Sequence, residues 1–360
     1  MKKLLLITLI AGLSSCSAID DNLDDCDTSF QLDYELRLVT NMNTELRTEL
    51  QTELSTQTEL SMANALRGHL SNIFTDFAHD VDLSFYDTQG DSVRLQHDEH
   101  VMNANQASYS LFLPMRQYMH LATANVVDNP VVTLTTDEYC HKSRLSLLGN
   151  QLDTISSHTT GVFTARQPME VLSGVDQTFN VKLYMANCAA TLVVDTVGSG
   201  IRDMKVYTTG FATAFNLADS TYVYSTVSPV VRTEQVTDNT ARGLMAFCSV
   251  NFPSPEVPLA TAGGVPAQGI HPTRSVLETE EPFVSGESTD ALWEIHVYAT
   301  TATGSITQTK LYVRKPLRAG QLKIIKVKLR PDGEVSTHDQ TVGVNVTLNW
   351  NTGGGYEPEL

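Results

Sequence analysis

The sequence predicts an all-β protein made of two β-sandwich domains, with a short helical insertion in the first. Threonine, which favours pleated and half-exposed surface, occurs 42 times among the 360 residues. Short runs of alternating apolar and polar residues recur along the chain, whereas long helical patterns are few. The length fits about two domains, and an apolar fraction of 41% gives each domain the residues for a core.

The first strands are expected in the N-terminal part of the chain. Apolar and polar residues alternate strictly from Phe30 to Leu38, the period of a strand with one buried face. The same alternation over 81–85 and 93–95 flanks Asp87-Thr88-Gln89-Gly90, whose Asp first and Gly last suit a type I turn, so this segment reads as a hairpin. A further strand over Tyr109–Leu113 should end at Pro114.

The helical insertion is expected after the first strand. The segment Asn43–Leu60 contains Thr-Glu-Leu four times, which places Leu46, Leu50 and Leu54 at fourfold spacing. That spacing makes a narrow helical stripe, and the abundant threonine indicates an exposed insertion. The next segment, Leu66–Phe77, has apolar residues at i, i+4, i+7 and i+11, which predicts an amphipathic helix packed on the sheet.

The second half continues with short strands. They are expected at 181–185, 190–194, 204–207 and 293–299. The pattern weakens between Gly161 and Gly174, where we place the domain boundary. This gives an N-terminal β-sandwich domain over 29–165, a C-terminal β-sandwich domain over 166–352 and a flexible tail over 353–360. Trp293 and Trp350 are in phase with apolar strand positions, which favours core packing over an exposed sugar-binding platform.

The last hairpin has the clearest pattern. Apolar residues of Leu322–Leu329 change phase after Ile324, which predicts a β-bulge. A turn at Pro331-Asp332-Gly333 follows. The final strand alternates over nine residues, and its inward positions are Val342, Val344, Val346, Leu348 and Trp350. This segment could serve as its own domain's core strand, the ordinary interpretation, or as a strand exchanged with a partner.

The N-terminus predicts export and lipidation. Two lysines precede an apolar run over 4–13, which is too short to span a bilayer and typical of a secretory signal peptide, here residues 1–15. Leu13-Ser14-Ser15-Cys16 resembles a bacterial lipoprotein box, in which Cys16 would carry fatty acyl chains such as palmitate. An ordinary signal peptide beside a chance cysteine is the alternative. Residues 16–28 would then be an acidic lipidated tether, either a surface-export segment or a solvated linker. An Asp directly after the lipidated Cys would resemble an inner-membrane retention signal. The residue at this position is Ser17, which favours the outer membrane.

Four cysteines remain after Cys16. They are Cys26, Cys140, Cys188 and Cys248. An even number in an oxidising compartment indicates two disulfides, and three connectivities are open. We favour Cys26 with Cys140 and Cys188 with Cys248, because each bridge then stays within one proposed domain. Buried free thiols are the alternative.

Charge and motifs exclude several functions. With 24 Lys and Arg against 41 Asp and Glu, the net charge of −17 argues against nucleic-acid binding. The chain has no nucleophile elbow, no zinc-protease motif and no phosphate-binding glycine loop, so we assign no catalytic residue and no cofactor. His97-Asp98-Glu99-His100 is a local group of metal-ligand types, but we interpret it as a polar loop and assign no metal site. Cys140-His141 could be a thiolate activated by an imidazole, but adjacent side chains seldom face each other, so we assign no catalytic role to this pair.

Several segments together resemble the FimB-type fimbrial anchor lipoproteins of Bacteroides-like bacteria. They are the lipoprotein box with its Asp-rich tail and Cys26, the strands Asp33–Thr40, Val81–Asp87 and Tyr109–Pro114, and the end of the chain from Val342 to Trp350 with its following glycines. The resemblance covers essentially the whole mature chain. Each motif is weak alone, whereas their order and spacing are fairly specific.

The resemblance implies two transthyretin-like domains and a non-enzymatic protein that attaches a fimbria to the outer membrane and limits its length. Its partners would be pilin subunits, the outer membrane through the lipid, and a host or bacterial surface ligand through the fimbria. Stalk subunits of such systems lose an N-terminal strand by proteolysis. Because cleavage after Arg37 or Arg47 would separate Cys16 from most of the body, we expect an uncut anchor. The alternative is a surface adhesin or glycan-binding lipoprotein on the same scaffold, and an enzyme ranks third.

Overall fold

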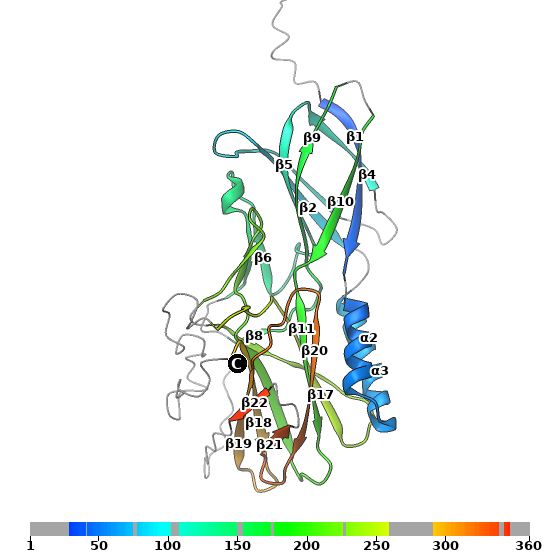
Figure 1. The fold of residues 1–360 in the computed structure, drawn as a ribbon, viewed down its shortest axis with the longest axis vertical. Coiled ribbons are helices and arrows are strands. Elements are labelled where there is room, and N and C mark those ends of the chain that lie inside the picture. Colours follow the sequence, from blue (N-terminus) through cyan, green and yellow to red (C-terminus); the bar gives the residue numbers. More distant parts are fainter. Residues whose placement is uncertain are drawn as a thin grey trace, which may run out of the picture.

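The computed structural model is an elongated molecule of two stacked units (Figure 1). The structure describes residues 29–40, 42–74, 78–101, 108–149, 154–173, 176–225, 228–258, 291–337 and 342–345. These residues form four β-sheets and two α-helices. The prediction of an all-β sandwich fold is therefore confirmed.

The upper unit in Figure 1 is built on a seven-stranded sheet with the order β3-β2-β5-β9-β10-β1-β4. Its strands are β1 (Ser29–Val39), β2 (Asp80–Asp87), β3 (Arg94–Val101), β4 (Ser108–Pro114), β5 (Gln117–Ala124), β9 (Phe163–Glu170) and β10 (Thr178–Met185). The predicted first strand, the hairpin and the strand that ends at Pro114 are confirmed as β1, β2–β3 and β4.

A four-stranded sheet with the order β14-β13-β7-β6 packs on the seven-stranded sheet. Its strands are β6 (Val132–Thr135), β7 (Arg144–Leu147), β13 (Ala214–Asn216) and β14 (Thr221–Val223), and the 3-10 helix η2 (Cys140–Lys142) lies between β6 and β7. Tyr86 and Leu121 of the larger sheet share one buried cluster with Leu145 and Phe215 of the smaller one. The smaller sheet joins strands from both halves of the sequence.

The lower unit is a sandwich of two sheets. The five-stranded sheet has the order β16-β17-β11-β20-β21, with β16 (Glu234–Val236), β17 (Leu244–Asn251), β11 (Cys188–Asp195), β20 (Leu322–Leu329) and β21 (Val335–Thr337). The six-stranded sheet has the order β22-β19-β18-β12-β15-β8, with β8 (Thr154–Ser156), β12 (Asp203–Thr209), β15 (Val230–Arg232), β18 (Trp293–Thr300), β19 (Ile306–Val313) and β22 (Val342–Asn345). Trp293 is fully buried between the two sheets, so its predicted core position is confirmed.

The domain boundary predicted between residues 165 and 166 falls inside β9. Strand β9 pairs with β5 without interruption from Phe163 to Glu170. Its alternation was hidden because exposed Arg166 and Pro168 stand beside a half-buried Gln167. Segments also cross between the units: β8 pairs with β15 in the lower unit, and β13 pairs with β7.

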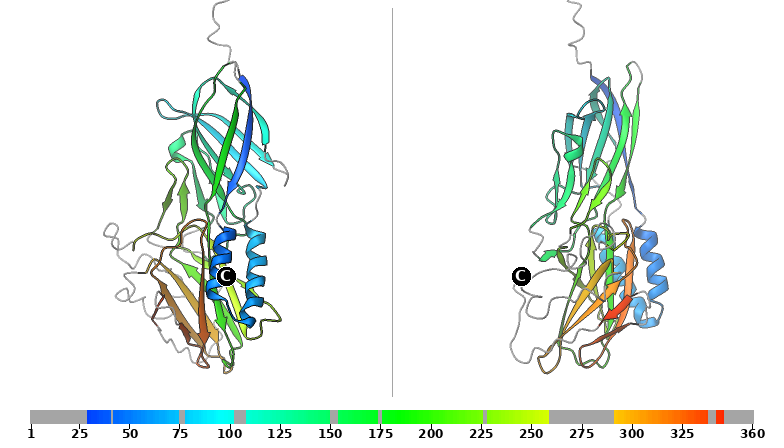
Figure 2. Two further views of the ribbon diagram at one scale, coloured as in Figure 1. Left: turned by 45° about the vertical axis from the view of Figure 1, so that its right-hand side comes forward. Right: turned by 60° about the vertical axis from the view of Figure 1, so that its left-hand side comes forward.

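The helices α2 (Met42–Glu53) and α3 (Gln57–Ile73) form a hairpin beside the lower unit (Figure 2). The hairpin packs against β20 and β17, so it covers the five-stranded sheet rather than the sheet that contains β1. Leu46, Leu50 and Leu54 are buried there. The prediction of a helical insertion after the first strand is confirmed, whereas the prediction that this insertion is exposed is wrong, because its leucines pack on the five-stranded sheet.

Glutamates of the same repeats complete this contact. Glu49 and Glu53 approach the ammonium group of Lys323 on β20 at 3.4 Å and 3.8 Å. Glu59 contacts Lys326 at 2.6 Å and also closes a capping box with Thr56 at the start of α3. The fourfold spacing in α2 therefore places the leucines in one buried stripe. It places the glutamates in a neighbouring stripe, where Glu49 and Glu53 contact Lys323 of β20.

The predicted β-bulge in Leu322–Leu329 is wrong. Strand β20 pairs with β11 in unbroken parallel register from Leu322 to Lys328. Apolar residues occupy both faces of β20 because both faces are covered. Leu322 and Ile324 face the helical hairpin, and Ile325 and Val327 face the six-stranded sheet.

A buried polar network joins the two units. The Asn187 side chain accepts a hydrogen bond from the N–H of Val162 and donates one to Nδ1 of His158 at 2.6 Å. Asn125 donates to the carbonyl of Gly161 at 2.9 Å. Burial lowers the pKa of His158 to about 3, which keeps the ring neutral and able to accept. These paired side chains fix the path of the chain between the units.

Candidate functional sites on two strands and a pocket

Strand β1 is an interior strand of the seven-stranded sheet. It pairs antiparallel with β4 from Ser29 to Glu35 and parallel with β10 from Asp33 to Val39. Leu32 and Tyr34 are buried on its inner face. Without β1, the edges of β4 and β10 would face each other across an empty strand position. Strand β1 therefore completes the sheet and the core beneath it.

Tyr34 links β1 to β5, which lies three strand positions away in the same seven-stranded sheet. His120 on β5 makes a 3.1 Å hydrogen bond to the carbonyl of Ser84, so Nδ1 is the donor and Nε2 the acceptor. The hydroxyl of Tyr34 donates to that Nε2 at 2.5 Å. Burial lowers the pKa of His120 to about 4, with the Ser84 carbonyl opposing the shift, so the ring is neutral at pH 7.

The two arginines considered as cleavage sites lie in regular structure. Arg37 is in the part of β1 that pairs with β10. Arg47 is in the middle of α2. A protease needs an accessible and extended backbone, and both peptide bonds are instead held in hydrogen-bonded elements.

The end of the chain supplies an edge strand. Within the described residues, β22 is the outermost strand of the six-stranded sheet and pairs with β19 from Val342 to Asn345. The neighbouring pair β18–β19 extends over eight residues on each strand. Val342 and Val344 of the predicted exchange segment thus lie in a short edge strand. Val346, Leu348 and Trp350 lie outside the described residues.

The predicted disulfide between Cys188 and Cys248 does not form. Both thiols are free and buried. Cys188 belongs to the core between the two sheets of the lower unit, whereas Cys248 faces the helical hairpin and accepts a hydrogen bond from Thr191 at 3.2 Å. Neighbouring strands place these two side chains on opposite faces of one sheet, so no rotamer joins them.

The other cysteine predictions concern the N-terminal part of the chain. Cys140 is a buried free thiol in η2, and burial raises its pKa. Its expected partner Cys26 lies outside the described residues, as do the signal peptide 1–15, Cys16, the tether 16–28 and the tail 353–360.

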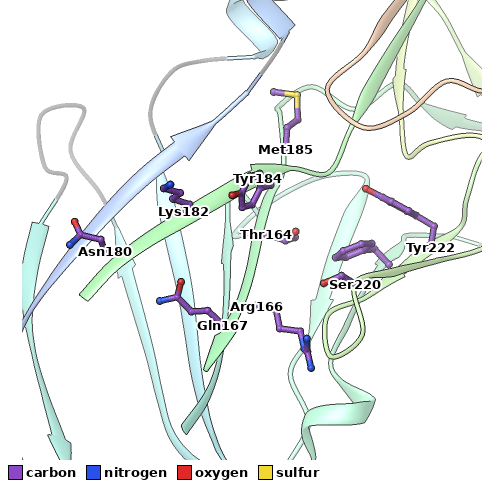
Figure 3. Close-up of a pocket in the computed structure, with 10 residues that line it drawn as sticks. Thr164, Arg166, Gln167, Asn180, Lys182, Tyr184, Met185, Ser220 and Tyr222 are labelled. Carbon is purple, nitrogen blue, oxygen red and sulfur yellow. The ribbon is translucent and has the colours of Figure 1, made fainter. Parts of the chain in front are cut away.

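A pocket of about 620 Å³ opens where β9 and β10 separate (Figure 3). The two strands pair only through Thr164 with Tyr184 and Phe163 with Met185. The lining residues come from β9, β10 and the β13–β14 hairpin: Thr164, Arg166, Gln167, Asn180, Lys182, Tyr184, Met185, Phe215, Ser220 and Tyr222. Two are cationic and none is acidic, although the whole chain carries a net charge of −17.

Tyr184 gives this pocket an accessible aromatic ring. Its side chain is 56% exposed, whereas the hydroxyl of Tyr222 is held by the carbonyl of Ala186 at 2.9 Å. Asn180 and Gln167 add amide groups that can donate and accept. The sequence pattern gave no sign of this pocket, because it depends on how far β9 and β10 separate.

The described residues contain no helix that is long and apolar enough to cross a membrane. No known family model matches the chain, and no curated protein matches it.

Solved structures with a similar chain path exist. The fimbrial anchor protein Mfa2 from Porphyromonas gingivalis aligns over 89% of this chain and 99% of its own, with 10% identity and a TM-score of 0.45. A candidate adhesin from Bacteroides thetaiotaomicron aligns over 90% and 100%, with 11% identity and a TM-score of 0.48. The tip fimbrial protein Mfa3 from Porphyromonas gingivalis aligns over 89% and 100%, with 10% identity and a TM-score of 0.39.

Proposed function

We propose that this protein is an outer-membrane lipoprotein that anchors or caps a fimbria at the cell surface. Lipidated Cys16 would hold it in the membrane, and the edge formed by β22 and β19 would contact a filament subunit. The observation that carries the proposal is the edge position of β22 within the described residues, in a chain whose residues Leu13-Ser14-Ser15-Cys16 resemble a lipoprotein box.

The physical basis of the contact is strand addition. An edge strand presents unpaired N–H and C=O groups, which an extended segment of a partner can pair with. Within the described residues, β22 pairs with β19 through four residues on each strand. At about 0.5–1.5 kcal/mol of net stability per hydrogen bond, these described pairs contribute a few kcal/mol. A partner strand that pairs over more residues of β19 could therefore displace β22, or could add beside it.

The N-terminal strand supports an anchor whose chain stays uncut. Strand β1 is paired on both sides and closes its own sheet, so the protein needs no strand from a neighbour at that position. Cleavage after Arg37 would remove most of β1 together with the lipid. We expect N-terminal sequencing of the mature protein to find no chain that starts at Leu38 or Thr48.

Photo-crosslinking in cells tests the strand contact. A photoreactive amino acid at position Val344 should crosslink to the filament subunit. Position Val197, which is exposed and follows β11 of the five-stranded sheet rather than the sheet that contains β22, serves as the control and should give no such product. Equal yields at the two positions, or no filament product at Val344, would refute the proposed contact.

A second function is favoured by the pocket between β9 and β10. An exposed tyrosine, two amides and two cations suit a neutral or acidic glycan, because a sugar ring packs on an aromatic face and its hydroxyls pair with amides. A glycan array probed with wild-type protein and with Tyr184→Ala tests this adhesin function. Phe112→Ala removes an equally exposed aromatic outside the pocket and should bind as wild type does. Loss of binding in both variants, or in neither, would contradict a glycan site here.

A further inference from the structure

Three metal-ligand side chains meet on one face of the seven-stranded sheet. They are Asp82 of β2 and His97 and Glu99 of β3, and their donor atoms all lie within 4.8 Å of one another. We propose that these three side chains bind a divalent transition-metal cation such as Zn²⁺. The site is independent of the fimbrial contact and of the pocket between β9 and β10.

Strand register explains why these residues converge. Strands β2 and β3 pair antiparallel, with Asp82 opposite Glu99 and Ser84 opposite His97. Residues directly opposite in an antiparallel pair project to the same face, and so do residues two apart on one strand. Asp98 projects to the other face, opposite Leu83. His97 and Glu99 therefore share one face of the sheet, Asp98 lies on the other, and Asp82 of the neighbouring strand adds a second carboxylate to the group.

At the buried end of the site, one polar side chain has no hydrogen-bond partner among the described residues. Asp82 is 4% exposed and has strands on both sides, and its carboxylate contacts Nε2 of His97 at 2.6 Å. Thr123 of β5 is directly opposite Asp82 and on the same face. Its side chain is 1% exposed, and its hydroxyl has no hydrogen-bond partner among the described residues. A water bound to the metal would supply a partner for that hydroxyl.

Small movements of these side chains would bring the donor atoms to ligand spacing, because all three lie within 4.8 Å of one another. Zinc bonds of about 2.0–2.2 Å in tetrahedral geometry keep ligand atoms about 3.3 Å apart. Nε2 of His97 is 3.7 Å from the Glu99 carboxylate but 2.6 Å from that of Asp82. The imidazole must therefore move away from Asp82 by less than an ångström. This movement is feasible because His97 is partly exposed on β3, which is the outer strand of the sheet.

Charge and donor type select the cation. Two carboxylates face a single imidazole, so the group attracts a cation. An imidazole nitrogen favours zinc, cobalt and similar ions over calcium, which prefers an all-oxygen site with more ligands. With three protein ligands, the remaining coordination positions would be open to water. Bound metal would also join the edge strand β3 to β2 and increase the thermal stability of the sheet.

Cobalt titration of the untagged full-length protein at pH 7 tests the site. We expect one equivalent of Co²⁺ to give the visible absorption of a bound ion, Zn²⁺ to displace it, and Ca²⁺ to leave it unchanged. His97→Ala and Glu99→Gln should each weaken Co²⁺ and Zn²⁺ affinity by about tenfold or more. Glu99 is largely exposed, so its variant should keep the fold.

Asp98→Asn is the matched control, because Asp98 is in the same sequence cluster but on the other face of β3. Its cobalt affinity should equal that of the wild type. The proposal is overturned if the wild type binds no stoichiometric metal, if His97→Ala and Glu99→Gln bind as well as wild type, or if Asp98→Asn loses binding to the same extent as Glu99→Gln.

Discussion

The attachment of β1 predicts the effect of removing one hydroxyl group. In Tyr34→Phe, Nε2 of the fully buried His120 loses its donor, while the packing of the ring is kept. A neutral hydrogen bond contributes about 1 kcal/mol net, and a buried acceptor left unpaired costs about 1–3 kcal/mol. We therefore expect the free energy of unfolding to fall by about 1–3 kcal/mol.

Urea unfolding of the wild type and the variant, followed by circular dichroism at pH 7.5, measures this difference. Tyr184→Phe is the control, because the Tyr184 side chain is largely exposed and its change should stay within about 0.5 kcal/mol. In a double-mutant cycle with His120→Leu, Tyr34→Phe should lose its effect. Equal small effects for the two tyrosine variants, or full additivity with His120→Leu, would refute the proposed attachment.

Two further predictions concern the helical hairpin and the buried histidines. Leu50→Ala should lower the free energy of unfolding by about 2–5 kcal/mol, because Leu50 is buried against the sheet. Leu60→Ala, at an exposed position of the fourth repeat, should change it by less than about 0.5 kcal/mol. Equal losses in urea unfolding would contradict the docked hairpin. The pKa values of His120 and His158 are about 4 and about 3 in the folded protein, whereas a histidine in the unfolded chain has a pKa of about 6.5. The stability of the folded protein that depends on these neutral rings is therefore complete above pH 6.5 and is lost as the pH falls toward 4. His120→Gln should therefore show a shallower loss of stability between pH 6.5 and 4.5 than wild type, and identical slopes would refute this.

Local alternation was sufficient to predict much of the upper unit. The strands over Phe30–Leu38 and Tyr109–Leu113 each have one buried face, so period-two patterning located them correctly. The helix predicted over Leu66–Phe77 was equally readable in its described part, because Leu66, Leu70 and Ile73 form a buried stripe in α3, while Phe77 lies outside the described residues. These features depend on neighbours within one element.

The errors share a different cause, which is contact between distant parts of the chain. The leucines and glutamates of the Thr-Glu-Leu repeats are explained by β20, roughly 270 residues away in sequence. The apolar faces of β20 suggested a bulge because sequence alone did not show that the helical hairpin covers its second face. The Cys188–Cys248 pair failed because its feasibility depends on strand register and face.

The same distinction between local patterns and distant contacts applies to the candidate sites. The strand β22 was predicted from a strongly alternating segment, whereas its edge position and the sheet it joins were not. The group around His97 was visible as a local cluster, but the sequence could not show that Asp82 from the neighbouring strand belongs to it. The pocket lined by Tyr184 depends on two strands that separate, a property with no local signal.

The most direct test of the proposed anchoring function is to remove the proposed lipidation site and measure where the filaments are. Cells that express wild-type protein or Cys16→Ser should be compared by electron microscopy, with filament subunits quantified in cell and medium fractions. Anchoring predicts that Cys16→Ser cells shed filaments into the medium or carry abnormally long ones. Unchanged filament length and cell association would contradict anchoring, and unchanged filaments with lost adhesion would favour the glycan-binding function.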